Sequence, residues 1–366
     1  MNIAIDARFY GLEHAGLGRY TLNLINELAK IDQDNTYTLF VWDKYKDLDL
    51  PDNFKTIIVN ANHHSLSEQV LLAKAIGINR FDLVHFPHFI VPVLNLTTPF
   101  IVTIHDLIKH KFQGIDTTTL PQYQYQIKNM LYRFDIWWAA KRSRSIITPT
   151  SFVKDDVVQY YNLPAEKVHV IGEGVDDNLL NVDESQQILD LKKPYFMYVG
   201  KSYAHKNVVA LINALESLPD DYSLYLVGEK QIFWDRIVEK VQNKDLLNRV
   251  HHLGFLTDEG LASVYKNAAA FASASYEEGF GLPPLEAMSL SCPVVLSDIP
   301  VHKEVCQDAA LYFDADDSER LAKLLLSLGD KDEDYTRRIN AGLERVKVYS
   351  WSKMASDVLK LYQNYR

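Results

Sequence analysis

The sequence predicts an α/β protein of two Rossmann-like domains, each a doubly wound parallel sheet, facing a cleft. Two observations carry this prediction. Short β-branched and aromatic runs alternate with stretches of helical periodicity along most of the chain, which is typical of parallel sheets covered by helices. The alternation stops near residue 173, gives way to polar residues, and restarts near residue 195. A chain of 366 residues has room for two such cores.

The first domain is expected to open with a strand at 3–5, a loop containing Gly16 and Gly18, and an amphipathic helix from Tyr20. Helices are also expected at 122–141 and 152–161. The further strands expected here are 37–42, 56–59, 83–86, 100–104, 145–148 and 168–171. The strands expected in the second domain are 195–199, 223–227, 250–253, 269–272, 294–296 and 310–313. We therefore expect domains at 1–172 and 173–348, with a C-terminal helix at 349–366 that packs back on the first.

The composition excludes several classes of protein. A net charge of −10 without a basic tract argues against a nucleic-acid partner. Two cysteines, Cys292 and Cys306, cannot build a disulfide framework or a metal cluster, which fits a reducing compartment. The sequence shows neither a signal peptide nor an apolar run of about 18 residues. We therefore expect a cytoplasmic protein.

A glycine- and proline-rich segment at 275–288 is the most informative part of the sequence. It follows an expected strand and precedes a helix whose first turn suits Pro284. Gly279 and Gly281 allow the backbone to approach a ligand, and amides entering a helix bind phosphate or hydroxyl oxygens. Glu278 and Glu286 flank the loop and could accept hydrogen bonds from two sugar rings. Alternatively, Glu286 only complements the helix dipole.

This segment resembles the E-x7-E signature of the retaining glycosyltransferase family four, which has the two-Rossmann-domain B-type fold. Four further motifs occur in the expected order: 6–8 with 16–20, 103–106, 171–176, and 198–200 with 206–207. The resemblance covers essentially the whole chain. It implies a first domain that binds the acceptor and a second domain that binds a nucleotide-sugar donor.

The resemblance also implies roles for individual residues. Glu286 would bind the ribose of the nucleotide, and Glu278 would contact hydroxyls of the donor sugar. The sugar and the diphosphate would be held by the amides of Gly279, Phe280, Gly281 and Leu282. His105, at the carboxyl end of an apolar strand, would contact the sugar near the reacting carbon. Lone histidines are more often structural, which is how we interpret His85 and His88.

A second phosphate-binding element is expected at residues 200–207, after the first strand of the second domain. Lys206 is a flexible charge suited to a diphosphate, although it could also be a solvated lysine. Family members usually pair this lysine with an arginine, and Lys201 and His205 stand at two places where that arginine occurs. A lysine keeps the charge but loses the bidentate fork, so the departure weakens the expected clamp.

The glycine loop at 16–18 does not complete a dinucleotide fingerprint, because Thr21 stands where the third glycine would be. A nicotinamide cofactor is therefore not expected, and the loop should close over the diphosphate or the acceptor. The Asp-x-Asp patterns at 47–49, 314–316 and 332–334 lie in polar stretches, so we expect neither a metal nor another cofactor. The aromatic and basic segment 131–144 could rest on an anionic membrane, but packing on the sheet is the favoured interpretation.

These observations together predict a retaining, metal-independent hexosyltransferase of polysaccharide biosynthesis. The donor would be a GDP- or UDP-linked sugar, with mannose first, and the acceptor a glycan or a lipid-linked sugar. Two alternatives share the fold: a sugar phosphorylase and a nucleotide-sugar epimerase. A third is a non-catalytic protein that binds nucleotide sugars. The chain should be soluble, with possible contact to the inner face of the cell membrane.

Overall fold

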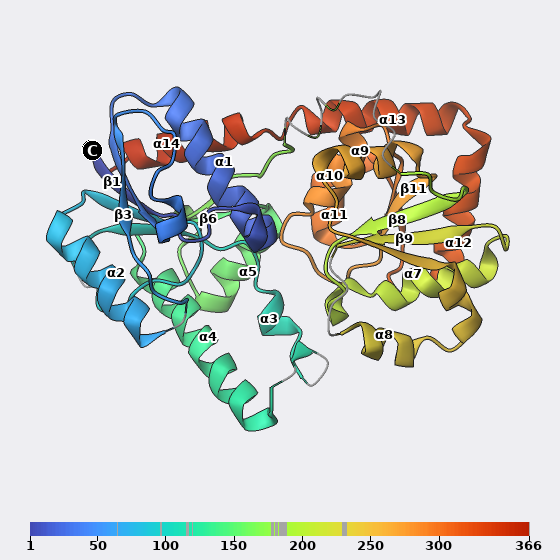
Figure 1. The fold of residues 1–366 in the computed structure, drawn as a ribbon, viewed down its shortest axis with the longest axis horizontal. Helices are drawn as coiled ribbons and strands as arrows, with labels where there is room; N and C mark the ends of the chain where they lie inside the picture. Colours follow the sequence, from blue (N-terminus) through green and yellow to red (C-terminus); the bar gives the residue numbers. More distant parts are fainter. Residues whose placement is uncertain are drawn as a thin grey trace. The chain divides into compact units, whose positions relative to one another are not determined.

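The computed structural model describes residues 1–63, 65–95, 97–114, 117–118, 120–176, 179, 182, 189–228 and 233–365. The chain forms two compact units, each built on one parallel sheet (Figure 1). Unit 1 contains Met1–His110, Leu120–Glu173 and Trp351–Arg366, and unit 2 contains Lys111–Thr119 and Gly174–Ser350. The prediction of two doubly wound α/β domains is confirmed.

Unit 1 contains a seven-stranded sheet in the order β3-β2-β1-β4-β5-β6-β7, and every neighbouring pair is parallel. Its strands are β1 Asn2–Asp6, β2 Thr36–Val41, β3 Phe54–Ile58, β4 Leu83–Phe86, β5 Phe100–Thr103, β6 Ser145–Thr148 and β7 Val168–Val170. The order reverses between β1 and β4. The loops at the carboxyl ends of these two strands diverge there, which is where doubly wound sheets bind ligands.

Five α-helices lie wholly in this unit in its described part: α1 Ala15–Ile31, α2 Leu66–Asn79, α4 Gln122–Arg142, α5 Ser151–Tyr161 and α14 Trp351–Gln363. The short helix α3 Ile108–Lys111 begins in unit 1, and its last residue belongs to unit 2. Short 3-10 helices are η1 Leu12–His14, η2 Asp43–Tyr45 and η4 Ala165–Lys167. The C-terminal helix α14 lies along α1 (Figure 1). Its Tyr362 hydroxyl lies 2.7 Å from Nδ1 of His85, which anchors α14 to β4. The expected return of this helix to the first domain is confirmed.

The start of α1 corrects the sequence analysis, because Gly16 and Gly18 lie inside the helix and not in a loop. Gly18 is buried, and a Cβ at this position would lie 1.9 Å from the carbonyl oxygen of Gly11. Glycine at this position therefore allows the backbone of α1 to lie close to the backbone at Gly11. A Cβ at Gly16 would meet nothing within 4 Å. The true loop after β1 is formed by the residues before Ala15.

Unit 2 contains a six-stranded parallel sheet in the order β10-β9-β8-β11-β12-β13. Its strands are β8 Tyr195–Val199, β9 Ser223–Val227, β10 Val250–Gly254, β11 Ala270–Ser273, β12 Val294–Ser297 and β13 Ala310–Phe313. Its α-helices are α7 Val208–Ala214, α8 Trp234–Lys240, α9 Asp258–Asn267, α10 Leu282–Ser289, α11 Pro300–Cys306, α12 Ser318–Ser327 and α13 Glu333–Val346. Its 3-10 helices are η5 Ala204–Lys206, η6 Leu215–Ser217, η7 Lys244–Arg249, η8 Gln307–Ala309 and η9 Leu328–Asp330. The strand order reverses between β8 and β11, so the loops after these two strands lie at the switch point.

Helix α4 has two different faces. Tyr132, Ile136, Ala139 and Ala140 are buried and pack into the core of unit 1. The opposite face leaves large apolar side chains exposed: Tyr123, Ile127, Met130, Leu131, Phe134 and Trp137, between 44% and 64% accessible. The favoured interpretation of segment 131–144 therefore holds for one face of the helix only. Among the helices of the described residues, none is long and apolar enough to cross a membrane.

Candidate donor and transfer site

In unit 2, the site forms where the loops after β8 and β11 meet. The two strands are hydrogen-bonded neighbours, so both loops leave the same edge of the sheet. The ammonium of Lys206, in the first loop, lies 2.5 Å from Oε2 of Glu278, in the second. The two side chains are 20% and 13% exposed, so the ion pair is largely shielded from water. The structure thus brings together the residues predicted to contact the diphosphate and the donor sugar.

Glu278 is held at both carboxylate oxygens. Besides Lys206, the Ser275 hydroxyl donates a 2.7 Å hydrogen bond to Oε1. Burial alone would raise the pKa of this carboxyl, but the charges of Lys206 and His302 and the hydrogen bonds hold it below the usual value. The glutamate is therefore an anion with a defined orientation.

The loop between the two glutamates is shaped by Gly281. Its φ of +90° is left-handed, which favours glycine, and it directly precedes α10. Pro283 and Pro284 lie in the first turn of α10, which was predicted for Pro284. Phe280 is buried and packs edge-on against Tyr349, with ring centroids 5.2 Å apart, which anchors the loop.

Glu286 lies in α10 beyond its first turn, which contains no acidic residue. The helix-dipole interpretation of Glu286 is therefore disfavoured, because the dipole acts within that first turn. The carboxylate is 4% exposed and accepts a 3.0 Å hydrogen bond from the Tyr265 hydroxyl of α9. Tyr265 is a residue that the sequence analysis missed, because its partner is 21 positions away on another helix.

The loop after β8 carries fewer positive charges than its sequence indicates. Lys201 is exposed and follows Gly200. His205 lies near the rings of Tyr203 and Phe112, with centroids 5.8 and 5.9 Å away. Burial, aided by the charge of Lys206, lowers the pKa of His205 to about 4. It is therefore neutral near pH 7, and Lys201 and Lys206 carry the positive charge of this loop.

A third segment reaches the same edge of unit 2. Lys111 forms an ion pair with Glu277 at 2.6 Å, and Phe112 lies near Tyr276 with ring centroids 6.1 Å apart. The Arg236 guanidinium donates to the carbonyl of Thr118 at 3.0 Å. The sequence analysis did not single out these residues, because Lys111 and Glu277 are 166 positions apart.

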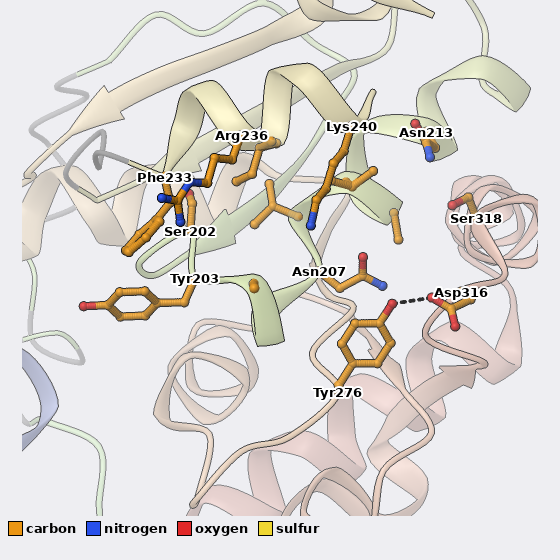
Figure 2. Close-up of a pocket in the computed structure, with 15 residues that line it drawn as sticks. Ser202, Tyr203, Asn207, Asn213, Phe233, Arg236, Lys240, Tyr276, Asp316 and Ser318 are labelled. Atoms are coloured by element: carbon orange, nitrogen blue, oxygen red, sulfur yellow. Dashed lines mark hydrogen bonds between the residues drawn. The ribbon is translucent and has the colours of Figure 1, made fainter. Parts of the chain in front are cut away.

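A hollow of about 300 Å³ lies beside the loop after β8 (Figure 2). Arg236 and Lys240 extend into it from α8, and a hydrogen bond from Tyr276 to Asp316 lies on its other side. The Asn207 amide donates 2.8 Å to the carbonyl of Ala315, tying the start of α7 to the loop after β13. Lys201, Lys206 and the loop residues 278–286 do not line this hollow, whereas Ser202, Tyr203, Ala204 and Asn207 of the predicted phosphate-binding element do.

In unit 1, His105 lies two residues after the end of β5, at the carboxyl edge of the sheet. Its Nδ1 lies 3.1 Å from Oε1 of Glu173, and its Nε2 lies 3.0 Å from the carbonyl oxygen of Pro87. The ring packs edge-to-face with Tyr20, with centroids 4.7 Å apart. Burial would lower the pKa of His105, but the hydrogen bond and the charge of Glu173 raise it above the ordinary value. The motif containing Glu173 was noted in the sequence, but its contact with His105 was not.

The structure places His85 and His88 in structural roles. His85 is fully buried between the hydroxyls of Tyr362 and Thr103, and burial lowers its pKa to about 3. His88 lies 3.1 Å from Asp6 and accepts a hydrogen bond from the Ile90 amide.

The Asp-x-Asp segments have structural partners or face solvent. Asp316 accepts the Tyr276 hydroxyl, and Asp332 caps α13 by accepting from the amide of Tyr335. Asp334 pairs with two arginines of the same helix, and Asp47 and Asp49 are exposed. Within the described residues, no three His, Cys, Asp or Glu side chains form a group that could hold a metal ion.

Two parallel-sheet α/β units, each with loops at a topological switch point, have the architecture of the B-type glycosyltransferases. Two family models match the chain in succession: "Glycosyltransferase Family 4" over residues 14–179 and "Glycosyl transferases group 1" over residues 181–345. The chain belongs to glycosyltransferase family four.

Curated relatives have related names. The O-antigen chain mannosyltransferase RfbU of Salmonella typhimurium is 32% identical, over 65% of this chain and 62% of that protein. The match thus spans less than two thirds of that relative. The O-antigen chain mannosyltransferase B of Escherichia coli is 26% identical, over 95% of this chain and 96% of that protein.

Solved structures agree on the fold. Sucrose-phosphate synthase of Thermosynechococcus elongatus superimposes with a TM-score of 0.78 at 20% identity, covering 100% of this chain and 98% of that one. HepE of Anabaena in complex with UDP gives a TM-score of 0.74 at 17% identity, covering 99% of each chain. These likenesses concern the fold alone.

Proposed function

We propose that the protein is a retaining hexosyltransferase that moves mannose from a nucleoside-diphosphate donor to a glycan or lipid-linked acceptor in polysaccharide biosynthesis. The observation that carries this proposal is the Lys206–Glu278 ion pair beside the glycine loop of unit 2. The names of the two O-antigen mannosyltransferases favour mannose. We place a guanine nucleotide first and a uracil nucleotide second.

The donor would bind at the switch point of unit 2. The diphosphate would lie against Lys206 and Lys201, and the amides of residues 279–282 would hold phosphate and sugar oxygens. Glu286, held by Tyr265, would accept hydrogen bonds from the ribose hydroxyls. A diphosphate competes with Glu278 for the Lys206 ammonium. Donor binding would therefore release one oxygen of Glu278 to accept a hydroxyl of the sugar.

Transfer begins as the bond between the anomeric carbon and the diphosphate lengthens. Negative charge then grows on the diphosphate, next to Lys206, Lys201 and the loop amides, which stabilise it. These groups supply the positive charge that a metal provides in other transferases, so the reaction needs no metal. The acceptor hydroxyl attacks the anomeric carbon from the face that the diphosphate leaves and gives its proton to an oxygen of the departing diphosphate, so configuration is retained. Ser275 holds Oε1 of Glu278, and the oxygen released from Lys206 accepts a sugar hydroxyl, so Glu278 orients the sugar and we do not assign it as a nucleophile.

Unit 1 would bind the acceptor, and His105 would contact the donor sugar near the reacting carbon. The exposed apolar face of α4 supports a lipid-linked acceptor, because an apolar stripe with cations beside it suits an anionic bilayer surface. The exposed cations at the end of α4 are Lys141, Arg142 and Arg144. We place the protein in the cytoplasm, with this face touching the inner surface of the cell membrane.

Thermal unfolding with nucleoside diphosphates of guanine, uracil, adenine and thymine, and with their sugar conjugates, tests the proposal. A ligand of the native state stabilises it by about 2.7 kcal/mol at a hundred times its Kd. We expect the guanine compounds to raise Tm and mannose transfer to persist in EDTA. Failure of every nucleotide at millimolar concentration, with sugar phosphate released from a glycan, would identify a phosphorylase instead. Full loss of activity in EDTA would disprove metal independence.

A further inference from the structure

The imidazole of His105 has an oxygen acceptor at each ring nitrogen. The carbonyl oxygen of Pro87 lies 3.0 Å from Nε2, and a carbonyl can only accept. Oε1 of Glu173 lies 3.1 Å from Nδ1, and an ionised carboxylate also only accepts. Both contacts are hydrogen bonds together only if both ring nitrogens carry a proton. A neutral ring would leave one of the two acceptors without its donor.

The groups around the His105 imidazole favour its protonated, positively charged form. Glu173 is 8% exposed and His105 is 22% exposed on their side chains, so water screens their attraction weakly. Asp106 follows His105 in the chain, and its charge also favours protonation. The Tyr20 ring packs against the imidazole, and its hydroxyl lies 3.2 Å from the Thr103 hydroxyl.

His85, the other histidine near Thr103, is neutral rather than charged. His85 lies beyond Thr103, with its Nε2 3.1 Å from that hydroxyl, and it faces no carboxylate in the described structure. Burial and the neighbouring histidines keep its pKa low, at about 3. The acidic partner Glu173 therefore distinguishes a charged histidine from a neutral one in the same buried region.

We propose that Glu173 is a positioning residue that holds His105 as a doubly protonated imidazolium with its Nε2 turned to Pro87. This inference rests on the proposed function, because it states the charge with which the histidine meets the donor. Both N–H groups are engaged before any ligand arrives. His105 therefore presents its positive charge and its ring edge to the donor. It can donate a hydrogen bond to the donor only if it first breaks its hydrogen bond to Glu173 or to Pro87.

The test uses the full-length protein labelled with ¹⁵N-histidine, without donor or acceptor. The signal of His105 is assigned as the one missing from His105→Gln. We expect both ring nitrogens of the wild type to be protonated at pH 7. Glu173→Gln keeps an acceptor but removes the charge, so one nitrogen should lose its proton at a lower pH. Glu173→Asp should restore part of the effect. Glu166→Gln, at an exposed glutamate of the same unit, should titrate like the wild type.

A neutral His105 ring in the wild type at pH 7 would overturn the proposal, whatever happens to the variants. So would a His105 titration in Glu173→Gln that coincides with that of the wild type. Because no substrate is present, this test is independent of whether the protein transfers mannose.

The kinetic arm measures mannose transfer between pH 6 and 9. The wild type should lose kcat as pH rises through the pKa of His105, and Glu173→Gln should lose it at lower pH. At pH 8 we expect about a tenfold lower kcat in the variant, with a smaller change in KM. This is less than the roughly hundredfold or larger loss usual when a catalytic acid or charge is removed, because His105 itself remains. A variant with unchanged kcat at every pH would limit Glu173 to a structural role and contradict the proposal.

Discussion

Lys206 and Glu278 form a 2.5 Å ion pair although 72 residues separate them in the chain. The pair exists because β8 and β11 are neighbours, so the loops that follow them meet. Each partner balances the other's charge while the site holds no donor. A diphosphate can replace the glutamate at the lysine, so the pair is ready for exchange.

Replacing Lys206 by Ala should lower kcat about a hundredfold or more, which is the usual cost of removing one group that stabilises a developing anion. The matched control is Lys323→Ala, at a lysine on α12 that is 68% exposed. Steady-state mannose transfer and circular dichroism check the pair of variants. Equal kcat in both folded variants would remove Lys206 from the mechanism.

The Glu286→Ala variant should weaken nucleoside-diphosphate binding about tenfold, because a buried acceptor for two hydroxyls is lost. Tyr265→Phe should weaken it less, since the carboxylate remains but loses one of its hydrogen bonds. Isothermal titration calorimetry with the diphosphate and with the free base separates the ribose contact from the rest. An unchanged Kd for Glu286→Ala would refute the ribose role.

Gly18→Ala should destabilise unit 1 by about 2 kcal/mol or more, because the new Cβ would lie 1.9 Å from the Gly11 carbonyl oxygen. Gly16→Ala in the same turn meets nothing within 4 Å and should be neutral or stabilising by up to about 1 kcal/mol. Urea unfolding measures both. Similar losses in the two variants would contradict the packing role of Gly18. The Gly16→Ala protein also tests the predicted donor contact, through its Kd for the nucleotide.

Acid should destabilise unit 1 through His85. Burial lowers its folded pKa to about 3, while the unfolded chain titrates near 6.5. Between these values the unfolded state binds the proton, so stability is lost as pH falls below 6.5, by up to about 1.4 kcal/mol per pH unit. Thermal unfolding from pH 7 to 4, compared with His85→Gln, isolates this contribution. The Tm of the variant should fall less steeply, and parallel curves would show that His85 does not titrate in this range.

The outer face of α4 should bind anionic vesicles. The wild type should co-sediment with phosphatidylglycerol vesicles. The double variant Phe134→Glu with Trp137→Glu should bind these vesicles at least about tenfold more weakly. Leu66→Glu, at an exposed apolar residue of α2, is the control. Equal binding by all three proteins would exclude this face as a membrane contact, while donor binding would be unaffected.

Sequence reasoning predicted the two sheets well, because parallel strands buried on both faces consist of continuous apolar runs. The observed β4, β6, β8, β9 and β13 coincide with the predicted strands, and the others differ by one or two residues at their ends. The prediction of a glycine loop at 16–18 was wrong. Glycine is a poor helix former, and only the position of Gly11 explains why Gly18 lies inside a helix.

The sequence by itself determined the fold class, the family and the segments that carry the chemistry, since local periodicity and motif spacing are properties of the chain alone. Only the tertiary structure decided which groups meet and which of them are charged. Glu173 next to His105, Lys206 next to Glu278 and Tyr265 next to Glu286 depend on strand order and helix packing. The charge of each titratable group depends on its burial and on the partners that the fold brings to it. His105 and His85 are alike as sequence residues. Their pKa values shift in opposite directions because, among the residues that the structure describes, only His105 of the two has a carboxylate beside it.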